Sequence, residues 1–472
     1  MLSKNIKTLN KHHNDMSIKV FNTLTRKKEL LKPLNGNNIN LFVCGPTVYD
    51  FSHIGHAKTY VQFDVIVRYL RYKGFEVFYL QNITDIDDKI IKRGNEQGKN
   101  PMTIARKFEK EYLSDMKELG ITSIDKYARA TDYIKPIIKQ IKTLFDKGFA
   151  YETSDGVYFE IDKFKDYGKL CHQPLDKIKE GARVSVNKEK KNPSDFSLWK
   201  KAKINEPSWD SPWGKGRPGW HIEDTAITET EFGPQYDLHG GGSDLIFPHH
   251  ESEIAQMEAS SGKKPFVKYW MHTAFLNIKK EKMSKSVGNF TTIREALRKW
   301  DEKTYRFYYA STHYRTPLDY SNEAVNKVKQ GLERINEFIR KVKIANGKKK
   351  NEIEKLIGET LDVFEKHMDN DFDMPQAIAS VYDFIRAVNK LELSKQNGKA
   401  IIGFFEKIDS VLGVMTFEDL EVPSEIQILA EKRQKAREKK DWATADKMRD
   451  KLKTKGYYID DTSKGPVVKK IS

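Results

Sequence analysis

Two histidines in the sequence HIGH, His53 and His56, stand where an expected strand gives way to an expected helix. The unpaired backbone N–H groups and the dipole at a helix N-terminus favour an anion there. Imidazole N–H groups at that position can stabilise negative charge that develops on a phosphate during a reaction. Two ordinary loop histidines are the alternative, so this short motif predicts phosphate chemistry only if its context agrees.

A second motif, KMSKS, places Lys282 and Lys285 on a polar stretch that ends near Gly288. Two ammonium groups three residues apart, with serine hydroxyls beside them, suit the binding of a triphosphate. A solvated run of charge is the alternative in a chain so rich in lysine. HIGH on the first strand-to-helix crossover, followed by KMSKS after the sheet pattern has resumed, resembles the signature of the class I aminoacyl-tRNA synthetases.

Three further residues, Cys44, His249 and Glu253, have the types and positions of metal ligands. His249 and Glu253 are i and i+4 on an expected helix and share one face of it. Cys44 ends the first expected strand, at the same edge of the sheet. Thiolate, imidazole and carboxylate are all zinc ligands, and a fourth ligand would complete a tetrahedron or give way to a substrate. The alternative is a small core cysteine beside a polar helix start.

The composition limits the class of protein. The chain has 472 residues, a length that suits about three domains. Hydrophobic residues make up 38% of it, which is enough to form buried cores. Lys and Arg exceed Asp and Glu by 16, which favours a polyanionic partner, although a lysine-rich proteome accounts for part of the excess. Two cysteines exclude a disulfide framework, so we expect a cytoplasmic protein. No apolar run reaches the ~20 residues of a membrane span, and residues 1–15 lack a secretory signal.

The order of the expected elements indicates an α/β protein with a doubly wound parallel sheet of the Rossmann type. Residues 41–84 show strand, helix and strand, the pattern of a parallel crossover, and the sheet pattern resumes at YDLHGGGSDLIF. Residues 100–210 between them look like an insertion. Beyond about residue 320, apolar residues at helical spacing predict a helix bundle. Two short basic helices and two strands are expected in the tail.

Nearly the whole chain closely resembles the cysteinyl-tRNA synthetase family, from VFNTLTRKKE near the start to DDTSKGPVVKK at the end. The motifs that carry this resemblance include FVCGPTVYDFSHIGHAKTY, NITDIDDKIIKR, GRPGWHIE, DLHGGGSDLIFPHHESEIAQ and EKMSKSVGNF. The resemblance implies a ligase that joins L-cysteine to the 3′ end of tRNA(Cys) through cysteinyl-adenylate made from ATP, and we expect it to act as a monomer. It also implies these divisions: N-terminal extension, 1–15; Rossmann catalytic domain, 16–125 and 211–270; connective peptide insertion, 126–210; stem-contact region with KMSKS, 271–320; helical bundle, 321–420; small α+β anticodon-binding domain, 421–472.

The family's reaction assigns roles to residues of this chain. No side-chain nucleophile is required, because the carboxylate of the substrate attacks the α-phosphate of ATP and positioning supplies the rate. Mg²⁺ would bridge the pyrophosphate that leaves. The resemblance implies the following roles: His53 and His56 for the α-phosphate, Lys282 and Lys285 for pyrophosphate, Asp244 for the ribose, and Thr84 and Trp220 for the amino-acid pocket.

The resemblance also implies one zinc ion, because a pocket alone distinguishes cysteine from serine by only about 1–3 kcal/mol. The family's ligands are two cysteines, a histidine and a glutamate. Cys44, His249 and Glu253 match three of them, but Asp224 stands where the second cysteine belongs. Asp224 could bind zinc through oxygen, the site could hold zinc weakly or take another divalent metal, or zinc could be absent. All three remain open on the sequence.

Four residues of the tail match positions that the family uses around the anticodon: Arg437, Trp442, Asp446 and Asp461. Arginine and aspartate can hydrogen-bond to splayed base edges, and tryptophan can stack on them. Packing within the tail is the alternative for Trp442. Two rival functions remain: a cysteine ligase acting on an amino-sugar thiol precursor, which residues 424–472 argue against, and a non-catalytic tRNA-binding relative, which HIGH and KMSKS argue against.

Overall fold

The computed structural model describes residues 17–174, 177, 188–278, 281–282, 290–418, 423–462 and 465–470, with backbone alone at 281–282, 424, 460–462, 465–467 and 469–470. The expected N-terminal extension, 1–15, lies outside the described residues. The chain divides into two compact units, Met1–Met415 and Thr416–Ser472, which are described separately. Among the helices that the structure describes, none is both long and apolar enough to cross a membrane.

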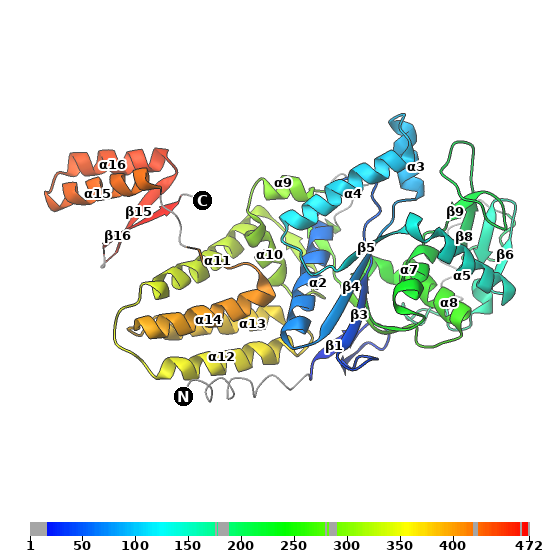
Figure 1. The fold of residues 1–472 in the computed structure, drawn as a ribbon, viewed down its shortest axis with the longest axis horizontal. Coiled ribbons are helices and arrows are strands. Elements are labelled where there is room, and N and C mark those ends of the chain that lie inside the picture. The colour runs from blue at the N-terminus through cyan, green and yellow to red at the C-terminus, as the bar shows by residue number, and fades with distance from the viewer. Residues whose placement is uncertain are drawn as a thin grey trace. The chain divides into compact units, whose positions relative to one another are not determined.

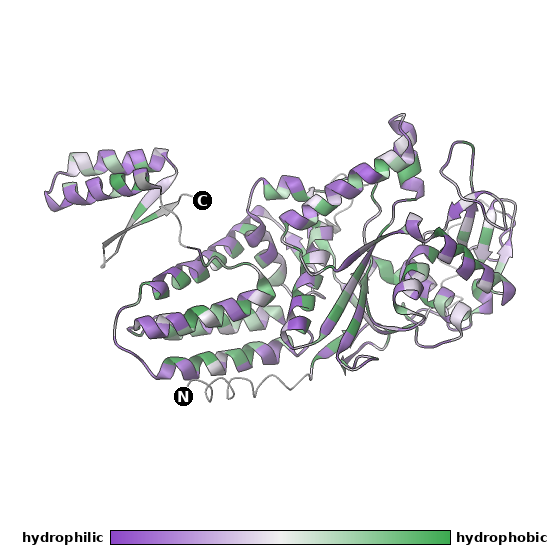
Figure 2. Cartoon of the chain, viewed as in Figure 1, coloured by the Kyte–Doolittle hydropathy of each residue, from purple (hydrophilic) through white to green (hydrophobic). Residues whose placement is uncertain are grey.

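A five-stranded parallel sheet forms the centre of the first unit, in the order β11-β10-β3-β4-β5 (Figure 1). Strands buried on both faces need continuous apolar sequence, and Figure 2 shows hydrophobic residues along β3 and β4. The chain runs outward from β3 to β5 and returns on the other side of β3, which confirms the predicted doubly wound fold. In such a sheet, ligands bind where the strand order reverses, here between β3 and β10. The strands are β3 (Asn38–Val43), β4 (Glu76–Ile83), β5 (Lys126–Arg129), β10 (Tyr236–Gly242) and β11 (Val267–Thr273).

The helix α2 (Ile54–Tyr72) makes the first crossover between β3 and β4. It is apolar on several faces because it packs on the sheet on one side and on helices of the bundle on the other (Figure 1). It ends just before Gly74, whose φ of +92° is left-handed and is adopted by glycine without steric cost. The remaining elements before the insertion are β1 (Lys19–Asn22), β2 (Lys27–Leu30), α3 (Asp88–Glu96) and α4 (Pro101–Glu118).

The insertion is built on a four-stranded antiparallel sheet, β6-β7-β8-β9, covered by helix α5 (Ile134–Asp146). Two of its expected boundaries were wrong. β5 was expected inside the insertion, yet it pairs with β4 of the parallel sheet. Gly216–Pro218 falls in the range expected for the catalytic domain, 211–270, yet it pairs with β8 of the insertion as the edge strand β9, where proline is tolerated. The strands are β6 (Ala150–Glu152), β7 (Gly156–Phe159), β8 (Phe196–Lys201) and β9 (Gly216–Pro218).

After β11 the chain forms a small three-stranded sheet and then the predicted helical bundle. The helical spacing of apolar residues predicted which side chains pack inside the bundle. The buried residues of α11 include Val325, Leu332, Ile335 and Ile339. The elements are β12 (Leu276–Ile278), β13 (Glu281–Lys282), α9 (Ile293–Leu297), α10 (Glu302–Ala310), β14 (Leu318–Tyr320), α11 (Asn322–Lys343), α12 (Glu352–Met368), α13 (Met374–Val388) and α14 (Lys395–Leu412).

The second unit contains two helices and an antiparallel strand pair, as the tail sequence predicted. Ala445 and Leu452 are buried in it, whereas Trp442 at the start of the second helix is 58% exposed. The elements are α15 (Ser424–Glu438), α16 (Trp442–Thr454), β15 (Tyr457–Thr462) and β16 (Gly465–Lys470).

A buried ion pair joins the bundle side of the first unit to α2. Arg306 on α10 is 1% exposed, and its guanidinium donates to Asp64 Oδ2 at 2.7 Å and to the carbonyls of Leu412 and Leu119 at 3.0 and 3.1 Å. Burial alone would raise the pKa of the Asp64 carboxyl, but Arg306 and then Arg68 hold it below its usual value. This carboxylate is therefore charged and depends on its partners.

Replacing Arg306 with methionine should destabilise the first unit by about 3–5 kcal/mol, because Asp64 then keeps a buried charge without its main partner. Urea unfolding followed by tryptophan fluorescence measures the change. Arg68 is the matched control, since its side chain also binds Asp64 but is 21% exposed, so Arg68→Met should cost distinctly less. Equal losses in the two variants would contradict the central role of Arg306.

Candidate active site and metal centre

A cavity of about 590 Å³ opens at the carboxyl ends of β3 and β10, where the strand order reverses. Trp220 stands at its wall, 39% exposed, and stacks on the ring of His249 with centroids 4.2 Å apart. The cavity is therefore wide enough for a nucleotide and has an aromatic side chain next to the candidate metal ligands. Five of the predicted residues line it: Cys44, His53, His56, Trp220 and Asp244.

The backbone at the start of α2 sets the protonation of both HIGH histidines. His53 is the N-cap, and its Nδ1 accepts a hydrogen bond from the backbone N–H of His56 at 3.3 Å. In return, the backbone N–H of His53 donates to Nδ1 of His56 at 3.4 Å, and the two rings stack 3.8 Å apart. A ring nitrogen that accepts carries no proton, so each neutral ring has its N–H at Nε2. Both imidazoles are thereby fixed as donors at Nε2.

The structure describes KMSKS only in part. The backbone of Lys282 lies in β13 and pairs with Asn277 of β12, the strand that begins at the cavity-lining Leu276. The side chain of Lys282 is not described, and Lys285 lies outside the described residues. The predicted contact of these two lysines with pyrophosphate stays a prediction.

The segment that follows KMSKS returns to the HIGH turn. The backbone N–H of Ile54 donates to the carbonyl of Thr291, and that of Ile293 donates to the carbonyl of Ser52, both at 3.0 Å. These bonds form on either side of a bridge between His53 and Thr292. Backbone contacts therefore hold residues 291–293, which follow KMSKS in the sequence, against the HIGH turn.

The candidate metal ligands meet at the floor of the cavity, and all are at most 5% exposed. Asp224, in the first turn of α7 (Ile222–Phe232), places Oδ2 3.0 Å from His249 Nε2 and 3.5 Å from Cys44 Sγ. Glu253, on α8 (Glu251–Ser261), places Oε1 3.0 Å from the same His249 nitrogen. His249 itself lies in the short π-helix η5 (Ile246–His250), one residue before its end. The structure therefore brings together the four predicted ligands Cys44, Asp224, His249 and Glu253.

The acidic groups of this cluster are buried, and no cation among the described residues balances their charge. Burial, and then the charges of Asp224 and Glu223, raise the pKa of Glu253 well above its usual value. Burial, and then Asp224 and Glu253, likewise raise the pKa of the Cys44 thiol. The oxygens of Glu253 lie 3.0 Å from His249 Nε2 and 3.6 Å from His239 Nδ1, but neither oxygen receives a hydrogen bond in the described part of the chain. A divalent cation would compensate these charges and fill the coordination of Glu253, so the donor set fits a metal.

Asn82 orients Asp224 and connects it to the predicted amino-acid pocket. Its side-chain N–H₂ donates to Asp224 Oδ1 at 2.6 Å and to the hydroxyl of Thr84 at 3.3 Å. Ligating carboxylates commonly have their second oxygen held in this way. Asp224 thus turns Oδ2 toward Cys44 and His249, while Thr84 lies 2% exposed behind the wall of the cavity.

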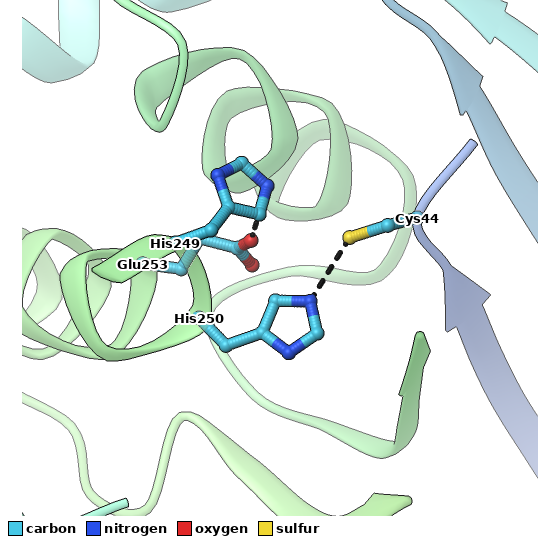
Figure 3. Close-up of side chains that lie close together, drawn as sticks. All are labelled: Cys44, His249, His250 and Glu253. Carbon is cyan, nitrogen blue, oxygen red and sulfur yellow. Dashed lines mark hydrogen bonds and ion pairs between the residues drawn. The ribbon is translucent and has the colours of Figure 1, made fainter. Parts of the chain in front are cut away.

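Sequence reasoning missed several histidines at this site. His250 lies beside Cys44, with Nε2 3.1 Å from Sγ (Figure 3). Its Nδ1 lies 2.8 Å from His272 Nε2, and His249 Nδ1 lies 2.8 Å from His221 Nδ1. His239 approaches Cys44 from β10, with Nε2 3.5 Å from Sγ. The pair of histidines in PHHESE was the signal for His250, and His239 lies within the motif DLHGGGSDLIFPHHESEIAQ, whereas His272 lies in none of the motifs quoted above.

The predicted anticodon residues lie in the second unit. Trp442 is exposed rather than packed, which removes the alternative of a core tryptophan. Asp446 forms an ion pair with Arg449 at 3.1 Å, and Arg437 lies near the end of α15. The backbone of Asp461 lies in β15, while its side chain is not described. Their contacts with RNA stay predictions.

Family models match three successive parts of this chain. Residues 30–330 match the catalytic domain of class I (C) tRNA synthetases, residues 363–416 match the DALR domain, and residues 419–466 match the cysteinyl-tRNA ligase anticodon-binding domain. The first match alone covers more than half of the chain and includes the whole cavity.

Known proteins are similar over the full length. The cysteine–tRNA ligase of Thermococcus onnurineus is 44% identical over 476 residues, covering 97% of this chain and all of that protein. The cysteine–tRNA ligase of Thermoplasma acidophilum is 47% identical over 449 residues, covering 94% of this chain and 98% of that protein. A solved methionyl-tRNA synthetase of Mycobacterium tuberculosis, in complex with methionyl-adenylate, shares the fold, with a TM-score of 0.59 at 15% identity over 79% of this chain and 89% of that one.

Proposed function

The chain belongs to the cysteine–tRNA ligase family, and on this premise we propose that its cavity selects cysteine through a metal ion held by Cys44, Asp224, His249 and Glu253. The protein is an ATP-dependent ligase that makes cysteinyl-adenylate and transfers cysteine to the 3′ end of tRNA(Cys). The observation that carries the proposal is the buried cluster of acids at the cavity floor, whose donors converge without a cation from the described residues.

Zn²⁺ fits this donor set. Bound there, it would take the sulfur of cysteine as a further ligand, for which the oxygen of serine is a poor substitute. Asp224 supplies the negative charge of the thiolate that the family carries at this position. Its oxygen is a harder donor than sulfur, so the site should hold zinc less tightly than a two-thiolate site and should accept Co²⁺ or Mn²⁺ more readily.

Residues around the cavity would carry out the rest of the activation reaction. The Nε2–H groups of His53 and His56 are set to donate to the α-phosphate as the carboxylate of cysteine attacks it. Asp244 would hold the ribose, and Thr84 and Trp220 would bound the amino-acid pocket. As the bond from the cysteine carboxylate to the α-phosphorus forms, pyrophosphate leaves together with Mg²⁺. Lys282 and Lys285 would balance the negative charge of this pyrophosphate. A monomeric state and a cytoplasmic location stay predictions.

Cysteine-dependent exchange of pyrophosphate into ATP tests the activation step without tRNA. We expect exchange that requires cysteine and falls to background with serine or alanine. Exchange at background level with cysteine, in protein that still binds tRNA(Cys), would overturn the assignment of an active adenylation site in favour of a tRNA-binding relative.

Trp442 offers a test of the second unit. If it stacks on a base of the anticodon, Trp442→Ala should lower kcat/KM for tRNA(Cys) by about 5- to 150-fold, the equivalent of about 1–3 kcal/mol of base stacking. Cysteine-dependent pyrophosphate exchange should not change, because that reaction needs no tRNA. Charging assays with varied tRNA(Cys) measure the difference.

A matched control is Ile428, which is apolar, 50% exposed and lies on α15 of the same unit. Ile428→Ala should leave charging within about twofold, as for most exposed positions. If both variants lose the same activity, or neither loses any, Trp442 does not stack on RNA.

A further inference from the structure

The cluster on the cavity floor contains one donor that the family's ligand set does not include, the imidazole of His250. The ligand atoms of Cys44, His249, His250 and Glu253 all lie within 4.8 Å of one another, and all four residues are buried (Figure 3). We propose that His250 Nε2 is a metal ligand in this chain, and that it supplies the donor lost with the second thiolate. This inference rests on the proposed metal site.

The spacing of the donors suits a shared ion. With His250 the site would have five protein donors, one more than a tetrahedron holds. Donors at about 2.0–2.3 Å from zinc lie roughly 3.3–3.6 Å apart in a tetrahedron, and roughly 2.8–3.5 Å apart when five share the ion. His250 Nε2 lies 3.1 Å from Cys44 Sγ, and Asp224 Oδ2 lies 3.5 Å from the same sulfur and 3.0 Å from His249 Nε2. These separations are close to those of ligands around one ion, and both imidazoles take part.

The hydrogen bonds behind His250 leave its Nε2 able to bind a metal. For Nε2 to be bare, Nδ1 must carry the proton and donate it to a partner. His250 Nδ1 lies 2.8 Å from His272 Nε2, and His272 Nδ1 lies 2.8 Å from the hydroxyl of Thr23, so each ring can donate to the next. His249 has a similar arrangement, with His221 behind its Nδ1 at 2.8 Å.

His239, the other imidazole near Cys44 among the described residues, has different neighbours. The hydroxyl of Tyr236 lies 2.6 Å from His239 Nδ1, and Glu253 Oε2 lies 3.6 Å from the same nitrogen. When the Tyr236 hydroxyl donates, the proton of His239 is on Nε2, which faces Cys44 Sγ at 3.5 Å. In that tautomer His239 donates to the sulfur and is not a ligand, whereas His250 can bind the metal.

Charge explains why a neutral donor suits this position. Cys44, Asp224 and Glu253 carry three negative charges when all are ionised, the same number as two thiolates and one glutamate. Asp224 thus replaces the charge of the missing thiolate but offers a harder oxygen donor. An uncharged imidazole adds a softer donor without adding charge to a site that is already buried.

X-ray absorption at the zinc edge of the full-length, metal-loaded protein tests this inference directly. Imidazole rings give a scattering pattern that can be counted separately from sulfur. We expect one sulfur and two imidazoles per zinc, from Cys44, His249 and His250. One sulfur and a single imidazole would overturn the role of His250 and leave the metal site itself in place. Full cysteine-dependent exchange by metal-free protein would instead overturn the proposed metal selection.

Two variants separate a ligand from its hydrogen-bond partner. In His250→Asn the amide can still reach His272 while Nε2 is removed, so zinc affinity should fall by more than about 100-fold and the spectrum should show one imidazole. His272→Phe removes only the hydrogen-bond partner of His250. Such a change typically lowers metal affinity by about 10- to 100-fold, and the spectrum should still show two imidazoles per zinc. Similar affinities for wild type and His250→Asn would contradict the proposal. If His250→Asn does not fold, the wild-type spectrum still decides.

Discussion

Cysteinyl-adenylate should form about 10²- to 10³-fold more slowly in His53→Asn protein than in wild type, because one preorganised donor to the developing phosphate charge is removed. His53 is the N-cap of α2, and its Nδ1 accepts from the backbone of His56, which leaves the proton on Nε2. The side chain of asparagine is too short to place an N–H where Nε2–H of His53 lies. Single-turnover formation of adenylate, with rapid quenching, measures the rate of the chemical step.

Asparagine at this position separates chemistry from folding. It is among the best N-cap residues, so the start of α2 should remain intact and the thermal midpoint should change little. The KM for cysteine should also stay near its wild-type value, since His53 is expected to act on the transition state. A rate within about threefold of wild type would show that His53 only caps the helix.

Asp224→Ala should lose its metal on dialysis and most of its preference for cysteine over serine. The variant removes a charged donor at 3.0 Å from His249 Nε2 and leaves Asn82 without its main acceptor. Without the metal, discrimination should fall to about 1–3 kcal/mol, the limit for a pocket that senses one small group. Metal content by mass spectrometry and the ratio of kcat/KM for the two amino acids measure both effects.

Asp224→Cys provides the matched control, because it restores the residue that the family carries. This variant should bind zinc more tightly than wild type and should lose relative affinity for Co²⁺ and Mn²⁺. Asn82→Ala should have an intermediate effect, since it removes only the hydrogen bond to Oδ1. If Asp224→Ala keeps full metal and full selectivity, Asp224 is not a ligand.

The parts of this protein that could be predicted from its sequence are those with a local signal. Apolar strands around HIGH and helical spacing beyond residue 320 indicated the sheet and the bundle, because periodicity reports burial directly. His249 and Glu253 were placed together for the same reason, as residues i and i+4. Cys44 joined them because parallel strands end at one edge of the sheet.

The errors and omissions have non-local causes. β5 reads KYAR and is a short edge strand with few apolar residues, so its pairing with β4 has no strand pattern of its own. His250 follows His249 by one residue, which in a helix points about 100° away, so spacing gave no reason to include it. His272 reaches the site because its strand pairs with β10 at Gly241, a register that sequence reasoning did not determine.

The buried ion pair of Arg306 also has a kinetic consequence. Its guanidinium binds carbonyls at the end of α4 and at the end of α14, and through Asp64 it holds α2 between them. Segments that share such a partner tend to open together rather than one by one. We therefore expect backbone amides in these three helices to exchange with solvent as one cooperative unit, so that the HIGH helix would loosen only when the adjoining edge of the bundle does.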